Sequence, residues 1–240
     1  MTEPGNASGV LGRFDRVERA VHWVNALLFV TLILTGACLY IQPLMALIGR
    51  RRLVEDIHVY AGLALPVPVI LALAGSWGRA LRADLGRLNR WTGDDGAWLR
   101  LTTRERTARR VAQQRLVVGK FNAGQKLNAA FVAGAGLVML GTGAILRWYR
   151  PFPLDWRAGA TFVHNWLALA LFVVIVGHIG MALSDRDAFG SMLTGRIDRR
   201  WALRHAPGWV VELDAARLPG RPADRPAPVP GPDAARRRVR

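Results

Sequence analysis

Four long apolar runs divide this chain of 240 residues, and they constrain its fold more than any other feature. They contain no aspartate, glutamate, lysine or arginine, and they cover residues 20–41, 57–77, 127–146 and 161–183. A helix needs about 20 apolar residues to cross a bilayer, and lipid offers an open backbone no hydrogen-bond partners. The sequence therefore predicts an all-α integral membrane four-helix bundle. Pro66 and Pro68 should bend its second helix.

Basic residues are shared unevenly among the segments that connect the apolar runs. The chain has 33 lysines and arginines against 17 aspartates and glutamates. The N-terminal arm, the connection between the second and third runs and the C-terminal tail hold 27 of the basic residues. A protein that binds nucleic acid would need its basic face on a soluble fold, so we expect membrane lipid around this chain and no nucleic acid. Because cationic loops stay in the cytoplasm, we expect a multi-pass inner (plasma) membrane protein with both termini cytoplasmic.

The same pattern divides the chain into four parts. The end of the chain is rich in proline and arginine and has too few apolar residues to fold, so we expect it to be disordered. The expected parts are an N-terminal arm at 1–19, a transmembrane domain at 20–183 with a basic cytoplasmic loop at 78–126, a cytoplasmic exit segment at 184–217 and the disordered tail at 218–240.

Four of the five histidines lie inside the apolar runs, where an ionisable side chain is costly unless it has a partner. His22 and His178 lie near the cytoplasmic ends of the first and fourth helices. His58 and His164 lie near the outer starts of the second and fourth helices. The four histidines therefore form two layers, one near each face of the membrane, whereas His205 in the exit segment is expected to be solvated.

The fourth helix supplies a histidine to each layer, and the spacing of the two favours planar cofactors. Fourteen residues separate His164 from His178 by about 21 Å along the axis, with a rotation about 40° short of four turns. Both rings therefore point from nearly the same face. Haem b suits these histidines, because the chain has no CxxCH motif and only one cysteine, Cys38. Two imidazoles fill both axial positions of an iron, which predicts electron transfer through two haem b groups.

Small residues in the first and third runs allow two interpretations. They either leave room for a haem between helices or pack closely against a neighbouring helix, and the sequence does not separate these roles. The residues concerned are Thr35 with Gly36 in the first run and Gly134, Gly136, Gly141 and Gly143 in the third.

Six motifs between residues 13 and 213 carry a specific resemblance. They are FDRVERAVHWVNA and DIHVYAG with the first two histidines, GKFNAGQK before the third run, FVHNWLA and VGHIGMAL in the fourth, and GRIDRRWALRHAPGW after it. Together they resemble the cytochrome b (gamma) subunit of respiratory formate dehydrogenases, within the wider group of di-haem bacterial cytochrome b561 and hydrogenase-type cytochromes b. The NAGQK and RRWA elements favour the formate dehydrogenase branch.

The resemblance implies which histidines hold which haem and where a quinone binds. It implies that His58 and His164 are axial ligands to the iron of the outer haem b, and that His22 and His178 are axial ligands on the cytoplasmic side. It also implies a menaquinone site that includes two residues of the third motif, Asn122 and Gly124.

The proposed quinone residues have a second interpretation. Asn122 can donate to a quinone carbonyl, and Gly124 lets the backbone come close. Asn122 followed by Gln125 also suits the capping box at the start of a helix, and the two roles can coexist.

The function that this resemblance implies is electron transfer within a formate dehydrogenase complex. Electrons would pass from an outer iron–sulfur beta subunit through two haem b groups to menaquinone on the cytoplasmic side. Formate would be oxidised by a separate alpha subunit with molybdenum or tungsten, so no residue here is assigned a catalytic role. The alternatives are a di-haem cytochrome b of another quinone-linked dehydrogenase, such as a hydrogenase or thiosulfate reductase, and a haem-free anchor or transporter.

Overall fold

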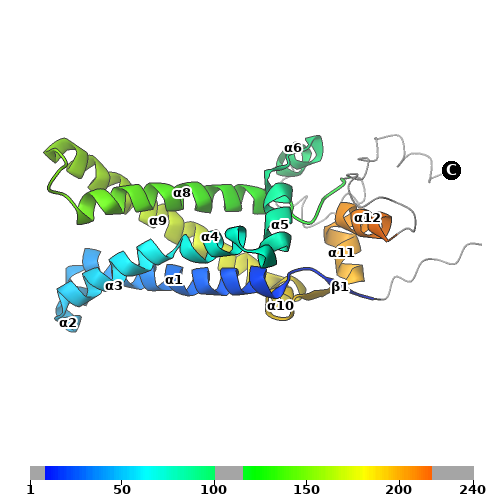
Figure 1. The fold of residues 1–240 in the computed structure, drawn as a ribbon, viewed down its shortest axis with the longest axis horizontal. Helices are drawn as coiled ribbons and strands as arrows, with labels where there is room; N and C mark the ends of the chain where they lie inside the picture. The colour runs from blue at the N-terminus through cyan, green and yellow to red at the C-terminus, as the bar shows by residue number, and fades with distance from the viewer. Residues whose placement is uncertain (1–8, 101–115, 218–240) are drawn as a thin grey trace, which may run out of the picture.

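Four long apolar helices form an elongated bundle, and the chain packs them as two neighbouring pairs (Figure 1). The computed structural model describes residues 9–100 and 116–217. Within this part, α1 packs along α3 and α8 packs along α9. The four helices are each long and apolar enough to span a membrane, which confirms the predicted all-α membrane bundle. They are α1 (Arg16–Tyr40), α3 (Arg51–Ala64) continued by α4 (Val67–Ala74), α8 (Ala123–Arg147) and α9 (Leu154–Ser184).

Two of the spanning helices begin in a polar turn that precedes the apolar run. The Asp15 carboxylate accepts from the backbone N–H of Glu18 at 2.7 Å, and the Glu18 carboxylate accepts from the backbone N–H of Asp15. Asn122 and Gln125 make the same reciprocal pair at the start of α8. Each capping box satisfies N–H groups that the first turn leaves without helical partners. Both helices therefore start before the apolar runs do.

The second span is interrupted by its prolines, as the sequence predicts. Pro66 has no N–H to donate to the carbonyl of Gly62, and this carbonyl accepts instead from Leu65 at 3.2 Å. Pro68 lies in the first turn of α4, where a missing N–H costs no helical hydrogen bond. The span is therefore split into α3 and α4.

Most of the shorter elements gather at one end of the bundle, and α2 (Gln42–Ile48) lies at the other (Figure 1). Two of the short helices lie in the expected basic loop, which is thus partly helical. The short elements are β1 (Val10–Gly12), η1 (Ser76–Gly78), α5 (Arg79–Asn89), α6 (Gly93–Arg100), α10 (Arg186–Thr194), β2 (Arg196–Asp198), α11 (Arg199–His205) and α12 (Pro207–Ala216). The predicted disorder of the tail falls outside the described residues, as do residues 1–8 and 101–115.

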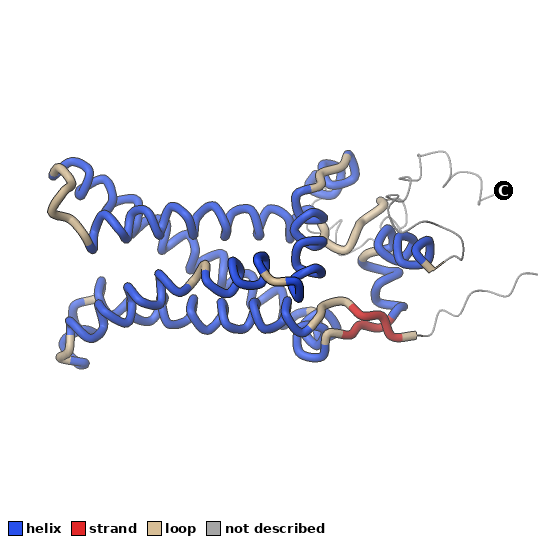
Figure 2. Tube along the Cα trace, viewed as in Figure 1, coloured by secondary structure: helices blue, strands red, loops and turns tan. Residues whose placement is uncertain are grey.

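The N-terminal arm and the exit segment are joined in one small unit. Strands β1 and β2 pair antiparallel, with Leu11 opposite Ile197 (Figure 2). These two side chains pack with Trp201 and Trp209 in a buried apolar cluster at the end of the bundle. The buried Arg13 guanidinium lies 4.5 Å from the Trp201 ring, and burial lowers the pKa of Arg13 to about 10 against the attraction of Asp185 and Asp84. The start of α1 is therefore held against the segment that follows α9.

Candidate functional site

The histidines expected near the outer face lie opposite each other between two helices. His58 on α3 and His164 on α9 have ring centroids 6.3 Å apart, with 63° between the ring planes. His58 belongs to the α1–α3 helix pair and His164 to the α8–α9 pair. The two rings therefore face each other across the middle of the bundle.

The other two membrane histidines form a second pair with nearly the same geometry. His22 on α1 and His178 on α9 have ring centroids 6.3 Å apart, with 61° between the planes. The structure thus brings the four histidines together in the two pairs expected from their depths. His205 lies elsewhere, exposed on α11, where its ring stacks on Trp201 at 4.5 Å.

Each pair fits a metal ion that takes one nitrogen from each ring. A metal bound at about 2 Å by each imidazole separates the ring centres by about 6 Å, close to the 6.3 Å of both pairs. Within the described residues, no group of three or more histidines, cysteines, aspartates or glutamates could hold a metal ion. Zinc in proteins needs three or four such ligands. Haem iron needs only axial ligands from the protein, so the two-histidine sets fit haem.

Threonines and glycines contact the outer histidine pair from the neighbouring helices. Thr35 Oγ1 on α1 lies 2.8 Å from His58 Nδ1, and Thr142 Oγ1 on α8 lies 2.9 Å from His164 Nδ1. The glycine after each threonine lies beside the same ring: a Cβ added at Gly36 would be 3.4 Å from His58 Cε1, and the equivalent distance from Gly143 to His164 is 3.5 Å. Both glycines therefore lie against a histidine ring, although these distances would also admit the methyl group of an alanine.

The remaining glycines of the third run do not pack against a neighbouring helix. A Cβ added at Gly134, Gly136 or Gly141 would meet no other described atom within 4 Å. Close helix packing therefore does not explain these three positions. A polar atom near the inner pair also lacks a partner within the described residues: Asn25 Oδ1 is buried without a hydrogen bond, three residues after His22 on α1. A bound cofactor or an ordered water at this level would give this oxygen a partner.

The motif GKFNAGQK at the start of α8 makes several contacts with the rest of the chain. Asn122 caps α8, as one of its two interpretations predicted. A Cβ added at Gly124 would lie 2.9 Å from the Trp98 ring on α6, so this glycine allows close packing of α6 on α8. The ring of Phe121 lies 6.4 Å from that of Phe14, just before α1. These contacts explain local roles for the motif, and the quinone role remains a prediction.

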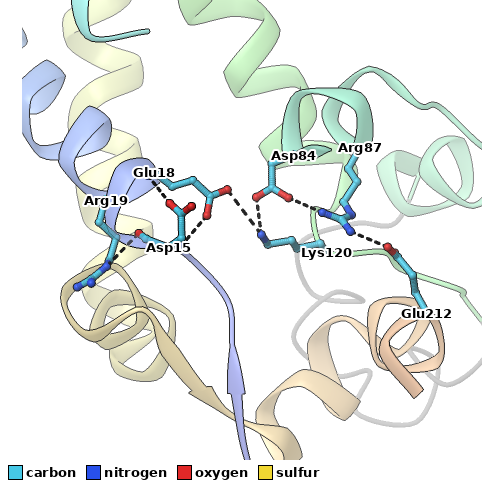
Figure 3. A network of polar contacts seen from close by, with 7 residues as sticks. All are labelled: Asp15, Glu18, Arg19, Asp84, Arg87, Lys120 and Glu212. Atoms are coloured by element: carbon cyan, nitrogen blue, oxygen red, sulfur yellow. Dashed lines mark hydrogen bonds and ion pairs between the residues drawn. The ribbon is translucent and has the colours of Figure 1, made fainter. Parts of the chain in front are cut away.

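A buried ionic network at the same end was not predicted from the sequence (Figure 3). Lys120 donates to the Asp84 carboxylate and lies 4.0 Å from Glu18 Oε1, and all three side chains are buried. Arg87 joins Asp84 at 2.7 Å to Glu212 at 2.6 Å. The network therefore ties together the start of α1, α5, the segment before α8, and α12. The signal was present in the sequence, since the only lysines, Lys120 and Lys126, both lie in the most distinctive motif.

The four spanning helices and the two histidine pairs define a class of membrane proteins that hold haem between helices. Comparison with known families identifies the family within this class. Residues 13–195 match the family described as prokaryotic cytochrome b561, and the chain belongs to this family. Membership of a cytochrome b family implies haem b as a cofactor. Together with the four apolar helices, it supports a multi-pass protein of the inner membrane.

Several curated relatives of this chain are cytochrome b556 subunits of formate dehydrogenases. The chain is 26% identical over 219 residues to the formate dehydrogenase, nitrate-inducible, cytochrome b556(Fdn) subunit of Escherichia coli (strain K12), covering 87% of this chain and 94% of the relative. It is 27% identical over 211 residues to the formate dehydrogenase cytochrome b556(fdo) subunit of the same strain, with 84% and 92% covered. For the formate dehydrogenase cytochrome b556 subunit of Haemophilus influenzae, identity is 24% over 208 residues, with 83% and 82% covered. The resemblance predicted from the motifs is confirmed.

Proposed function

We propose that this chain is the membrane cytochrome b subunit of a formate dehydrogenase complex, carrying electrons from an outer iron–sulfur subunit through two haem b groups to menaquinone on the cytoplasmic side. The observation that carries the proposal is the presence of two histidine pairs, His22 with His178 and His58 with His164. In each pair the ring centroids are 6.3 Å apart. Haem b supplies a one-electron carrier when it is bound between two imidazoles, with no axial position left for oxygen.

The chain's own residues would hold the two carriers at different depths. His58 and His164 would be the axial ligands near the outer face, and His22 and His178 the axial ligands near the cytoplasm. α9 would link the two sites, because it contributes one ligand to each. An electron that crosses the full membrane potential changes in energy by about 2.3 kcal/mol per 100 mV, so two layers of ligands suit energy conservation.

The quinone site is proposed beside the inner histidine pair. The contacts of Lys120 with Glu18 and of Phe121 with Phe14 hold the segment before α8 against the start of α1. Glu18 lies one helical turn before His22. Asn122 and Gly124, which follow this segment directly, would therefore lie near the level of the inner haem. They would orient menaquinone there while protons are taken from the cytoplasm.

The proposed orientation follows the distribution of basic residues. Both described chain ends and helices α5 and α6 lie at the same end of the bundle (Figure 1). Among the described residues, most arginines belong to the segments at this end, and cationic segments are retained in the cytoplasm. The opposite end, with α2 and the connection from α8 to α9, would face the outer partner subunits: an iron–sulfur beta subunit and a molybdenum or tungsten alpha subunit. The divisions at 1–19, 20–183, 184–217 and 218–240 are proposed on the same basis.

Haem analysis of the protein purified from its native membrane tests the proposal. The reduced-minus-oxidised spectrum should show a b-type band, and the haem content should be two per chain. His58→Ala or His164→Ala should each leave about half the haem, because the inner ligands are intact. His205→Ala is the matched control, since this exposed histidine stacks on Trp201 and belongs to neither pair.

Two outcomes would contradict the proposal. A wild-type protein without a b-type band would mean that the histidines are structural. Loss of both haems from each outer variant, with a folded protein, would mean that the layers are not independent sites. The subunits that copurify with the chain test the partner assignment. A nickel–iron subunit in place of a molybdenum or tungsten subunit would mean that the chain belongs to a hydrogenase and not to a formate dehydrogenase.

A further inference from the structure

The two outer histidines are held by the same local arrangement in both helix pairs. In α1–α3, Thr35 contacts the ring of His58, 23 residues later, and in α8–α9, Thr142 contacts the ring of His164, 22 residues later. In each pair the threonine lies on the first helix and the histidine on the second. The repetition in two separate helix pairs argues against a chance contact.

The contacts of the threonine hydroxyls favour one position for the proton of each histidine ring. Thr35 Oγ1 donates to the backbone carbonyl of Thr31 at 2.6 Å, and Thr142 Oγ1 donates to that of Val138 at 2.8 Å. A hydroxyl that gives its single proton to a helix carbonyl can only accept from the histidine beside it. In that arrangement Nδ1 of His58 and of His164 carries the proton, and Nε2 is left with a free lone pair. This is the tautomer that can bind a metal through Nε2.

We propose that Thr35 and Thr142 are positioning residues that hold His58 and His164 with Nε2 directed at the iron of the outer haem, and that their hydroxyls lower the reduction potential of this haem. The inference rests on the proposed function. A metal-bound histidine whose other nitrogen donates to an acceptor is oriented by that bond and becomes a more basic ligand. A more basic ligand favours ferric over ferrous iron, which lowers the reduction potential.

The inner pair lacks this support in the part of the chain that the structure describes. Neither His22 nor His178 has a hydrogen bond to a ring nitrogen there. The hydroxyls would thus act on one haem only. Because electrons move towards the higher potential, a lowered outer potential favours transfer from the outer ligand pair to the inner one. The two threonines would thus favour electron transfer from the outer haem to the inner haem.

The test compares threonine variants in the purified complex. Thr35→Val and Thr142→Val keep the side-chain shape and remove the acceptor, whereas Thr35→Ser and Thr142→Ser keep the hydroxyl. Thr31→Val is the matched control, because its hydroxyl donates to Leu27 of the same helix. Redox titration of the optical spectrum gives both midpoint potentials, and His58→Ala identifies the outer haem. The EPR signal of the low-spin ferric haem reports the angle between the imidazole planes.

Each valine variant should raise the outer potential and change the outer EPR signal, with the inner haem unaffected. A tenfold shift in the preference for ferric over ferrous iron corresponds to about 59 mV. Loss of the outer haem in the valine variants alone would also support the proposal, since such partners contribute about 10–100-fold to metal affinity. Wild-type values in both valine variants, or equal changes in valine and serine variants, would overturn it. Absence of haem from the wild-type protein would instead refute the proposed function itself.

Discussion

Lys126 Nζ lies 2.7 Å from Asp95 Oδ2, and this buried ion pair joins the first turn of α8 to the basic loop helix α6. Each side chain is only 8% exposed, and Lys126 also donates to the backbone carbonyl of Arg90 at 2.8 Å. The loop between the second and third spans is therefore anchored by a charge that belongs to the motif with the proposed quinone residues. A change in the structure of the loop should therefore also affect the proposed quinone site.

Asp95→Ala should lower the free energy of unfolding by about 3–5 kcal/mol, because it leaves the Lys126 ammonium buried without its partner. Asp95→Leu combined with Lys126→Met should recover most of this loss, since apolar side chains can replace a buried pair. Unfolding in mixed detergent micelles measures both effects. Glu55→Ala is the control, because Glu55 pairs with Arg51 at an exposed position and its removal should cost less than about 1 kcal/mol. Equal losses for Asp95 and Glu55 would contradict the expectation.

Lys120→Met should be at least as destabilising, because the lysine lies between two buried carboxylates. Without it, Glu18 loses its neighbouring cation and Asp84 keeps only Arg87 (Figure 3). The expected loss is about 3–5 kcal/mol, measured by detergent unfolding. Adding Asp84→Asn to Lys120→Met should restore part of the stability by removing one unbalanced charge. If the single variant unfolds like wild type, the network does not hold α1 to α5.

The membrane architecture was predictable because its determinants are local in the sequence. An uncharged apolar run of about 20 residues has few stable alternatives to a spanning helix, and the depth of each histidine follows from its place in a run. The pairing of His22 with His178 and of His58 with His164 needed only these depths and the alternation of sides. Whether they ligate iron is still a prediction.

Other features could not be predicted because they depend on which faces of the helices meet. Thr35 could be seen beside Gly36, but nothing in the sequence shows that its hydroxyl reaches a ring 23 residues away. The pairing of Lys126 with Asp95 likewise depends on the fold of the basic loop, which has too little hydrophobic periodicity to predict α6. The polar first turn also hid the start of α1, although Asp15 is a good cap.

Gly124→Ala tests whether this glycine serves packing or quinone access. The added methyl group would meet the Trp98 ring at 2.9 Å, so α6 or the ring must shift, at a cost of about 1–3 kcal/mol. Trp98→Leu should weaken this penalty in the double variant if the clash is its cause. Detergent unfolding gives the coupling energy between Gly124 and Trp98. The rate of quinone reduction, measured where the variants are fully folded, gives the effect on function. A normal unfolding curve with slow quinone reduction would instead favour direct contact of Gly124 with the quinone.

Asn122 is the residue for which capping and quinone binding can be separated most cleanly. Its side-chain oxygen accepts from the backbone N–H of Gln125 at 3.0 Å, which an aspartate carboxylate can also do, whereas asparagine also offers an amide N–H to a quinone carbonyl. Asn122→Ala should therefore lose about 1 kcal/mol of stability and slow quinone reduction, with both haems retained. Asn122→Asp should keep the stability and still slow quinone reduction, because a carboxylate can cap the helix but has no N–H to donate, as measured by reoxidation of the reduced haems with a menaquinone analogue. If the aspartate variant reduces quinone at the wild-type rate, Asn122 acts only as the cap of α8, and the quinone site must be sought elsewhere around the inner histidine pair.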